Sequence, residues 1–434
     1  MANIKPFKGY RYNTEKIDEL KDVMAPPYDF ISQNQGVEFF EKNPYNAIRL
    51  VSSNKLSESE IDPHERAAQF LKDSIQNNIL KQDLTDSIYL YEQQVTVNNE
   101  PFSSRGFVCL LEVTGYEHGI VVPCELPSTN SKLDRLDMVS KVQANGSMIS
   151  FKYIDNGKTL SEIISEVSET EPIMDFETND EIHQRLWQIT DTATINTIVS
   201  EFKNKLTYLI DGHNRYEAYC EYKKLMMETD SNYSPDKPYN YTLALLTESK
   251  DDGMMQRPIH RLIKFPKGFR EDFIIAGAQD HFKIEKIIID TSDESIEETM
   301  KKQIATQRKE IKIALYCGGN YFYRLTYRND GEMERLLPDA SDTYRSLDLS
   351  VLNKLILEDL CNINEDTSDE RVFYTTSLAE GVQSVNNGEC GCMFVVNPVR
   401  RNQMTDIILS DELLPKRSLS VYPKPATGVI IYRF

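Results

Sequence analysis

Helix-like and strand-like periodicities alternate along this chain, and the alternation limits its possible folds more than any other feature. Residues 64–80 place apolar side chains at helical spacing, and Pro63 suits the first turn of such a helix. Residues 87–97 alternate like a strand, and residues 107–116 resemble its partner across a polar turn. Further helix-like and strand-like segments follow at 159–167, 194–204, 206–210 and 241–249. The pattern predicts an α+β fold of mixed sheets with helices.

The sequence changes character after about residue 265. Residues 290–302 are typical of an acidic helix or linker, 311–330 of a hairpin, and 348–360 of a helix. Residues 372–398 predict strand–helix–strand. At roughly 150 residues per domain, a chain of 434 residues is expected to hold about three. We therefore expect an N-terminal α/β region at 1–115, a central core at 116–265 and a C-terminal α+β region at 266–434.

The net charge argues against nucleic acid and membrane partners. The chain carries 49 Lys and Arg against 68 Asp and Glu, a formal charge of −19, which opposes binding to phosphate polyanions and anionic lipid. Seven cysteines without a C-x-x-C pair argue against a disulfide framework or structural zinc. The polar N-terminus does not resemble a signal peptide, and no apolar run approaches eighteen residues. We expect a soluble, cytoplasmic protein.

One strand–turn–helix pattern, at 206–227, carries reactive side chains. An apolar strand leads to Asp211, Gly212 permits a tight turn, and a helix is predicted to start near His213. The helix N-terminus would favour an anion, and Arg215 adds a forked donor suited to phosphate oxygens. Asp211 could hold a metal or orient a hydroxyl. The alternative is that Asp211 only caps the helix.

A second polar segment, at 121–151, combines a carboxylate with cations. Glu125 precedes Lys132 and Arg135, which share one face if the stretch is helical. A general base beside a phosphate clamp is one interpretation, and a surface loop with a salt bridge is the other.

Other residues could contact a substrate. Two proline-containing segments, 25–29 and 43–50, carry Tyr28 and Arg49, for which a packed loop is an equal alternative. His260 and Arg261 could line a site or form an exposed basic turn. Lys424 and Arg417 could bind anions, although plain surface charge is favoured. The motifs of Walker ATPases, Rossmann enzymes and zincins are all missing from the sequence.

Nine motifs in order resemble a large bacterial and protist family long filed as a domain of unknown function. They are APPYD (25–29), NPYNAIRL (43–50), SRGF (104–107), KLDRLDM (132–138), RLWQITD (185–191), DGHNRYEA (211–218), PIHRL (258–262), LDLSVLNKLILEDL (347–360) and YPKPATG (422–428). The family resembles free-serine kinases with a ParB/sulfiredoxin-like core, and some members are regarded as pyrophosphate-dependent. Cys124 and Asn214 stand where the family usually has histidine, which leaves the phosphoryl donor open.

The resemblance implies a kinase that transfers phosphate from pyrophosphate to L-serine, giving O-phosphoserine and phosphate with Mg²⁺. Glu125 would be the general base, with Asp211 and His213 also catalytic and Asp211 a candidate metal ligand. The expected phosphate-binding residues are Gly212, Asn214, Arg215, Lys132 and Arg135. The expected substrate contacts are Tyr28, Arg49, Asn145, His260 and Arg261. An ATP- or ADP-dependent kinase, a phosphoserine phosphatase and a non-catalytic ParB-like binding or regulatory protein remain alternatives.

Overall fold

The computed structural model describes most of the chain. The described residues are 1–27, 31, 33–52, 61–97, 99–125, 132–251, 253–265, 271–289, 294–306, 310–364 and 370–434, without the side chains of 33, 34 and 132. They divide into two compact units. The first comprises Met1–Pro123, Pro127–Met255 and Val421–Phe434, and the second comprises Cys124–Leu126 and Gln256–Ser420. These units cut the chain differently from the three expected regions, because 1–115 and most of 116–265 share one unit; the three-part division stays a prediction.

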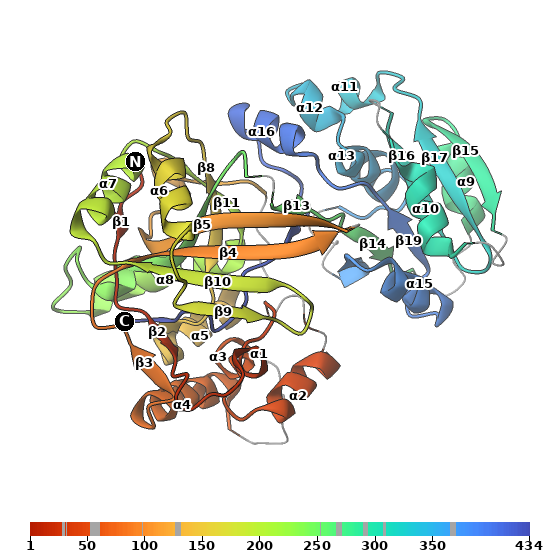
Figure 1. The fold of residues 1–434 in the computed structure, drawn as a ribbon. Helices are drawn as coiled ribbons and strands as arrows, with labels where there is room; N and C mark the ends of the chain where they lie inside the picture. Colours follow the sequence, from red (N-terminus) through yellow and green to blue (C-terminus); the bar gives the residue numbers. More distant parts are fainter. Residues whose placement is uncertain are drawn as a thin grey trace. The chain divides into compact units, whose positions relative to one another are not determined.

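The first unit is built on a nine-stranded mixed sheet (Figure 1). Its order is β6-β11-β8-β12-β5-β4-β10-β9, and β1 also pairs with β5. The β11–β6 and β12–β8 pairs are parallel and the other pairs are antiparallel. The strands are β1 (Ile4–Lys5), β4 (Ile88–Val97), β5 (Glu100–Glu112), β6 (Val121–Pro123), β8 (Ile149–Tyr153), β9 (Met174–Glu177), β10 (His183–Ile189), β11 (Thr207–Asp211) and β12 (Tyr241–Glu248).

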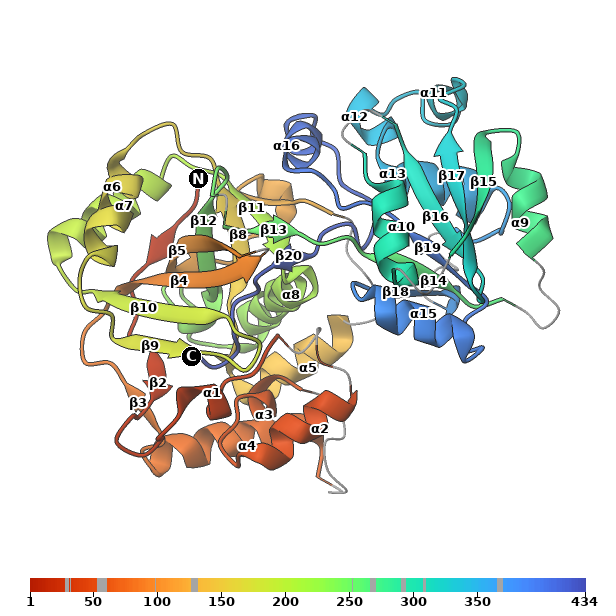
Figure 2. The same ribbon diagram turned by 45° about the vertical axis from the view of Figure 1, so that its right-hand side comes forward.

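Two further short pairs join distant parts of this unit. They are β2 (Tyr10–Tyr12) with β3 (Leu80–Gln82), and β7 (Ala144–Asn145) with β21 (Tyr432–Arg433). The helices are α1 (Leu20–Val23), α2 (Gln33–Lys42), α3 (Ile48–Val51), α4 (Pro63–Gln76), α5 (Lys132–Val142), α6 (Thr159–Ser168), α7 (Thr192–Phe202) and α8 (His213–Thr229), with short 3₁₀ turns at Tyr116–His118 and Pro238–Asn240. In Figures 1 and 2, α6 and α7 lie together against the sheet, whereas α2, α3 and α4 gather near α5.

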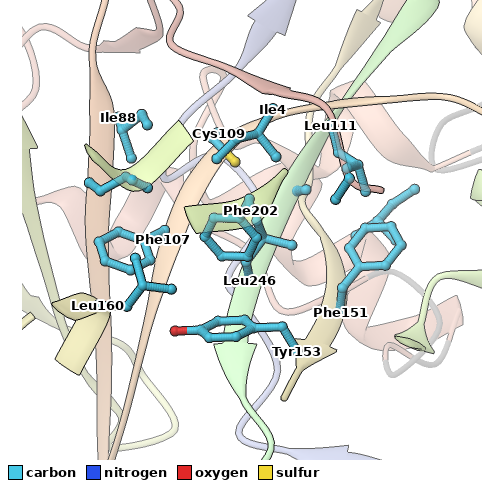
Figure 3. Packing of buried hydrophobic residues seen from close by; sticks show 14 of the residues in the cluster. Ile4, Ile88, Phe107, Cys109, Leu111, Phe151, Tyr153, Leu160, Phe202 and Leu246 are labelled. Atoms are coloured by element: carbon cyan, nitrogen blue, oxygen red, sulfur yellow. The ribbon is translucent and has the colours of Figure 1, made fainter. Parts of the chain in front are cut away.

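The main core of the first unit lies between the sheet and the helices α6 and α7. Alternate residues of β5, Phe107, Cys109 and Leu111, are buried on one face and pack with Leu160 of α6 and Phe202 of α7 (Figure 3). Side chains on one face repeat every two residues along the strand and about every 3.6 residues along the helices. Each element therefore has one apolar face, and these faces are buried against each other. The rigid sheet fixes the position of β11, whose end carries Asp211.

The second unit has a six-stranded sheet in which every pair is antiparallel. The order is β15-β17-β16-β19-β14-β18, made of β14 (His260–Ile263), β15 (Phe282–Ile288), β16 (Lys312–Tyr316), β17 (Tyr321–Tyr327), β18 (Val372–Thr375) and β19 (Cys392–Val395). Its helices are α9 (Glu271–Ala278), α10 (Ile296–Ile304), α11 (Glu332–Leu336), α12 (Asp342–Arg345), α13 (Asp348–Leu352), a π-helical turn (Asn353–Glu358), α15 (Leu378–Asn386) and α16 (Arg401–Leu409). The short strands β13 (Met255–Gln256) and β20 (Val421–Tyr422) lie where the chain passes from one unit to the other.

The mixed α+β fold predicted from periodicity is confirmed, and most of the expected elements are present. The hairpin at 311–330 and the strand–helix–strand at 372–398 are β16–β17 and β18–α15–β19. The expected turn between 97 and 107 is wrong, because β5 already begins at Glu100. Polar cross-strand pairs stabilise this part of the strand. Arg105 lies opposite Glu92, and its Nε donates to Oε1 of Glu92 at 2.6 Å. The ParB/sulfiredoxin-like description of the core stays a prediction.

Candidate functional site

The turn between β11 and α8 has the form that the DGHNR segment predicts. Gly212 is the N-cap of α8 and has φ of +92°, a conformation that residues with a Cβ rarely adopt. A Cβ at this position would lie 3.0 Å from Nη2 of Arg215. Glycine is therefore needed here both for the backbone conformation and for the close approach of the guanidinium group.

Asp211 is held between two buried cations and does not cap the helix. Its Oδ1 accepts a hydrogen bond from Nζ of Lys424 at 2.5 Å, and its Oδ2 accepts one from Nη2 of Arg215 at 3.1 Å. All three residues are at most 9% exposed. The capping interpretation is thus wrong, and so is the interpretation of Lys424 as surface charge. One carboxylate against two cations leaves a net positive charge in the cluster, where partial burial strengthens its field.

Arg215 reaches from α8 to the segment that follows β7. Its Nη1 donates to Oγ of Ser147 at 2.7 Å and to the carbonyl of Met148 at 2.9 Å. Residues of this segment, of α5 and of α8 enclose a cavity of about 30 Å³ that both Arg215 and Arg135 line. Nη1 of Arg135 donates to the carbonyl of Val51 in the same wall at 3.0 Å. The structure therefore brings together two of the predicted phosphate-binding residues.

The residues at the start of α8 are largely buried. His213 is 8% exposed at the first helical position. The Oδ1 atom of Asn214 is buried and accepts no hydrogen bond from the described part of the chain. The first N–H groups of a helix have no acceptor within the helix and carry part of the positive end of its dipole. This end of α8 can therefore stabilise an anion.

Three further predicted residues of the first unit have structural partners. Arg49 donates to the carbonyl of Phe40 and stacks on its ring, with 3.4 Å from Cζ to the ring centroid. Oδ1 of Asn145 accepts from the N–H of Leu243 at 2.7 Å, so this side chain joins β7 to β12. Lys132 begins α5, as the helical expectation requires, but its side chain lies outside the described part of the structure, as does Tyr28.

Glu125, the predicted general base, belongs to the second unit. Its Oε2 accepts hydrogen bonds from the backbone N–H groups of Ser418 and Leu419, both at 3.0 Å. Residue 125 also forms a parallel bridge with Leu414. Two backbone donors on one oxygen fix the orientation of the carboxylate.

His260 and Arg261 are buried in β14, so the interpretation as an exposed turn is wrong. Arg261 donates through Nη2 to the carbonyls of Lys416 and Arg417 at 3.2 and 3.0 Å. Burial lowers the pKa of Arg261 to about 10, although the charges of Tyr374 and Glu125 oppose this shift. Arg261 therefore lies within electrostatic reach of Glu125 and lines a cavity of about 40 Å³ with Tyr374.

A metal ion has little to bind at Asp211 in this arrangement. Both carboxylate oxygens already accept from cations, and no group of three or more potential ligands occurs among the described residues. Mg²⁺ takes oxygen ligands and commonly keeps several waters while binding substrate phosphates. Asp211 as a metal ligand stays a prediction, and it would require Lys424 or Arg215 to move.

A family model matches residues 4–350, and the chain belongs to that family, which is described as protein of unknown function (DUF1015). The predicted resemblance is thereby confirmed over this range. No curated protein matches the chain. Over the described residues, the helices are too short or too polar to cross a membrane.

Solved structures share only a distant likeness with the chain. A conserved hypothetical protein from Pyrococcus furiosus is 10% identical over 71% of this chain and 90% of its own, with a TM-score of 0.33. A free serine kinase in complex with AMP is 8% identical over 70% and 84%, with a TM-score of 0.33. SbnI with a C-terminal truncation, from Staphylococcus aureus, is 9% identical over 75% and 81%, with a TM-score of 0.34. At these scores the likeness carries no functional argument.

Sequence reasoning missed Ser147 in the cluster around Asp211, and it named Lys424 as a possible anion ligand but favoured surface charge. Lys424 lies 213 positions away from Asp211, and Ser147 is an ordinary serine beside the predicted Asn145. The YPKPATG motif was the available signal for Lys424, since a lysine between two prolines lies in a segment of restricted conformation. No sequence signal separates Ser147 from its neighbours.

Proposed function

We propose that this protein transfers a phosphoryl group from pyrophosphate to the hydroxyl of L-serine. The observation that carries the proposal is the buried cationic cluster at the start of α8, in a chain whose net charge is −19. A chain that repels anions overall needs local cations to bind a multiply charged anionic donor. Phosphoryl transfer needs positioning and neutralisation of oxygen charge more than covalent help, which cations of this kind supply.

The donor would bind to Arg215 and Arg135 with the N–H groups at the start of α8. A cavity of about 30 Å³ holds about two water molecules, so donor binding would have to widen it. The ammonium group of Lys424 would then leave Asp211 and bind a phosphate oxygen. Pyrophosphate has no base or ribose, in keeping with the lack of Walker and Rossmann motifs in the sequence. Magnesium would enter with the substrate as magnesium pyrophosphate.

Glu125 would accept the proton of the serine hydroxyl as its oxygen attacks the nearer phosphorus. The new O–P bond forms O-phosphoserine, the bridging P–O bond breaks, and orthophosphate leaves. The two backbone N–H groups on Oε2 support this role because they hold the carboxylate in one orientation. The base and the cations are tested separately.

The test follows phosphoserine by ³¹P NMR in the presence of protein, L-serine, magnesium and pyrophosphate. We expect signals of phosphoserine and orthophosphate in equal amounts. Turnover with ATP or ADP but not with pyrophosphate would identify a nucleotide as the donor. Hydrolysis of phosphoserine supplied as the only substrate would indicate a phosphatase. Retention on DNA without any turnover would favour the ParB-like binding protein.

The base is tested with Glu125→Gln, which keeps an oxygen that can accept the N–H groups of Ser418 and Leu419. We expect kcat to fall by about 10²–10⁴-fold, the usual contribution of a general base. Glu334→Gln on exposed α11 is the matched control and should keep full activity. Full activity in Glu125→Gln would remove Glu125 from the mechanism.

The cations are tested with Arg215→Lys, which keeps the charge but loses the forked geometry. We expect weaker pyrophosphate binding, seen as a KM at least about tenfold higher. The control Arg335→Lys changes an exposed side chain on α11. An unchanged KM for pyrophosphate in Arg215→Lys would place the donor elsewhere.

A further inference from the structure

One cavity within the second unit has about 720 Å³, and Glu125 is not among its lining residues. It is lined by α10 from its N-cap to Ile304, by the N-terminal end of α15, by His260 and the segment before it, and by the end of β19 with the segment that follows. α10 and α15 lie on the same side of the sheet and share one apolar cluster (Figures 1 and 2). Cavities of about 300–1,000 Å³ are the usual size for small-molecule sites.

His260 supplies a hydrogen-bond donor in this cavity wall. The residue is 2% exposed, and its Nδ1 accepts from the N–H of Val396 at 3.4 Å. Burial and the charge of Arg261 lower the pKa of His260 to about 3, so the ring is neutral at pH 7. A neutral imidazole that accepts at Nδ1 carries its proton on Nε2. His260 lines the cavity, and its Nε2–H donates to none of the described residues.

Two helix N-termini open on the same cavity. Ser295 and Ser377 cap α10 and α15, and each hydroxyl accepts a single backbone N–H. Leu378 and Ala379, the first two residues of α15, line the cavity, and the N–H groups at these positions have no acceptor within their helix. Together with Nε2–H of His260, they favour a carboxylate.

The remaining wall adds an apolar surface and charges of both signs, from Arg257, Glu297, Glu298 and Lys301. Glu297 lines the cavity from α10, is half-buried, and has no ion pair recorded with any residue of the described ranges. Its neighbour Glu298 is already paired with Lys301 at 2.7 Å. Ile304 and Val395 lie on the same wall. Donors for an anion, a carboxylate for a cation and apolar side chains thus occur in one cavity.

We propose that this cavity binds a free α-amino acid with an apolar side chain. Its carboxylate would accept hydrogen bonds from Nε2–H of His260 and from the first N–H groups of α15. Its ammonium group would pair with Glu297, and its side chain would contact Ile304 and Val395. The site uses His260, which the family resemblance assigned to substrate contact, and its test needs no catalytic activity.

The test uses isothermal titration calorimetry on the full chain with L-leucine as the probe. Two analogues test the two charged groups of L-leucine one at a time: 4-methylpentanoate lacks the ammonium group, and 3-methylbutylamine lacks the carboxylate. We expect L-leucine to bind in the micromolar to millimolar range and each analogue to bind at least about tenfold more weakly. Lack of binding at 10 mM L-leucine, or equal binding of the pentanoate, overturns the proposal.

Two variants locate the site without disturbing the core. Glu297→Gln should weaken L-leucine about tenfold and leave 4-methylpentanoate unchanged. Ala379→Glu adds a carboxylate at an exposed position in the first turn of α15, where it suits the helix dipole but repels the ligand carboxylate. Its matched control is Ala193→Glu, the same change at the second position of α7. Unchanged affinity in both Glu297→Gln and Ala379→Glu would overturn the location.

A readout on the unaltered protein keeps the proposal testable if a variant misfolds. The chain has six histidines, so ¹⁵N-histidine labelling gives a resolvable set of imidazole signals. Saturating L-leucine should shift the Nε2 resonance of His260, assigned through its loss in His260→Gln. Binding of L-leucine that leaves this resonance in place would show that the amino acid occupies another site.

Discussion

The ion cluster around Asp211 gives the sharpest quantitative prediction. Replacing Lys424 by methionine keeps most of the apolar stem and removes the ammonium group that donates to Oδ1 at 2.5 Å. Removing one partner of a buried ion pair typically costs about 3–5 kcal/mol. Asp211 keeps Arg215 at 3.1 Å and the repulsion between the two cations is relieved. We therefore expect Lys424→Met to lower the free energy of unfolding by about 2–3 kcal/mol.

Replacing Asp211 by asparagine should cost more. Asp211→Asn leaves two buried cations without their shared anion, and we expect a loss of about 3–5 kcal/mol. In the Lys424→Met background, Asp211 has only Arg215 beside it. Asp211→Asn should therefore lower the free energy of unfolding by less in that background than in the unaltered protein. The double-mutant cycle should give a coupling energy of at least about 1.5 kcal/mol.

The assay is urea unfolding followed by tryptophan fluorescence. The only tryptophan, Trp187, is 3% exposed in β10, so its emission reports on the first unit. Lys21→Met removes an exposed lysine that lies 3.5 Å from Glu19, and this control should change stability by less than about 0.5 kcal/mol. A coupling energy below about 0.5 kcal/mol, or a smaller cost for Asp211→Asn than for Lys424→Met, would refute this account of the cluster.

Three other predictions concern acid stability, the turn at Gly212 and a helix cap. Because the pKa of His260 is about 3 in the fold and about 6.5 when unfolded, its contribution is complete above pH 6.5 and is lost as the pH falls. Hydrogen exchange of β14 should show about 2 kcal/mol less stability at pH 5 than at pH 7, a loss that His260→Gln should reduce. Gly212→Ala should cost at least about 1 kcal/mol more than Gly119→Ala by urea unfolding, because both have positive φ but only Gly212 faces Arg215; equal costs would contradict this. Asp62→Ala removes the acceptor for two N–H groups of α4 and should cost about 1 kcal/mol in the same assay, where no change would argue against the cap.

Local patterns in the sequence were sufficient to predict individual elements. Pro63 and the apolar spacing that follows predicted α4, and the Asp–Gly step after an apolar strand predicted the start of α8 at His213. These signals are local, because helix periodicity, capping and left-handed glycine depend on residues only a few positions apart. Where long-range pairing decides, prediction failed: β5 begins at Glu100 because its polar residues pair with β4.

In the candidate site, too, local features could be predicted from the sequence and long-range contacts could not. By itself, the sequence determined the DGHNR turn with Asp211 and Arg215, and membership of the family. Only the tertiary structure decided that Asp211 binds Lys424 instead of capping its helix, and that His260 is buried and neutral instead of exposed. Both outcomes depend on which distant segments are brought into contact, and burial then changes what each charge costs and which partner it takes.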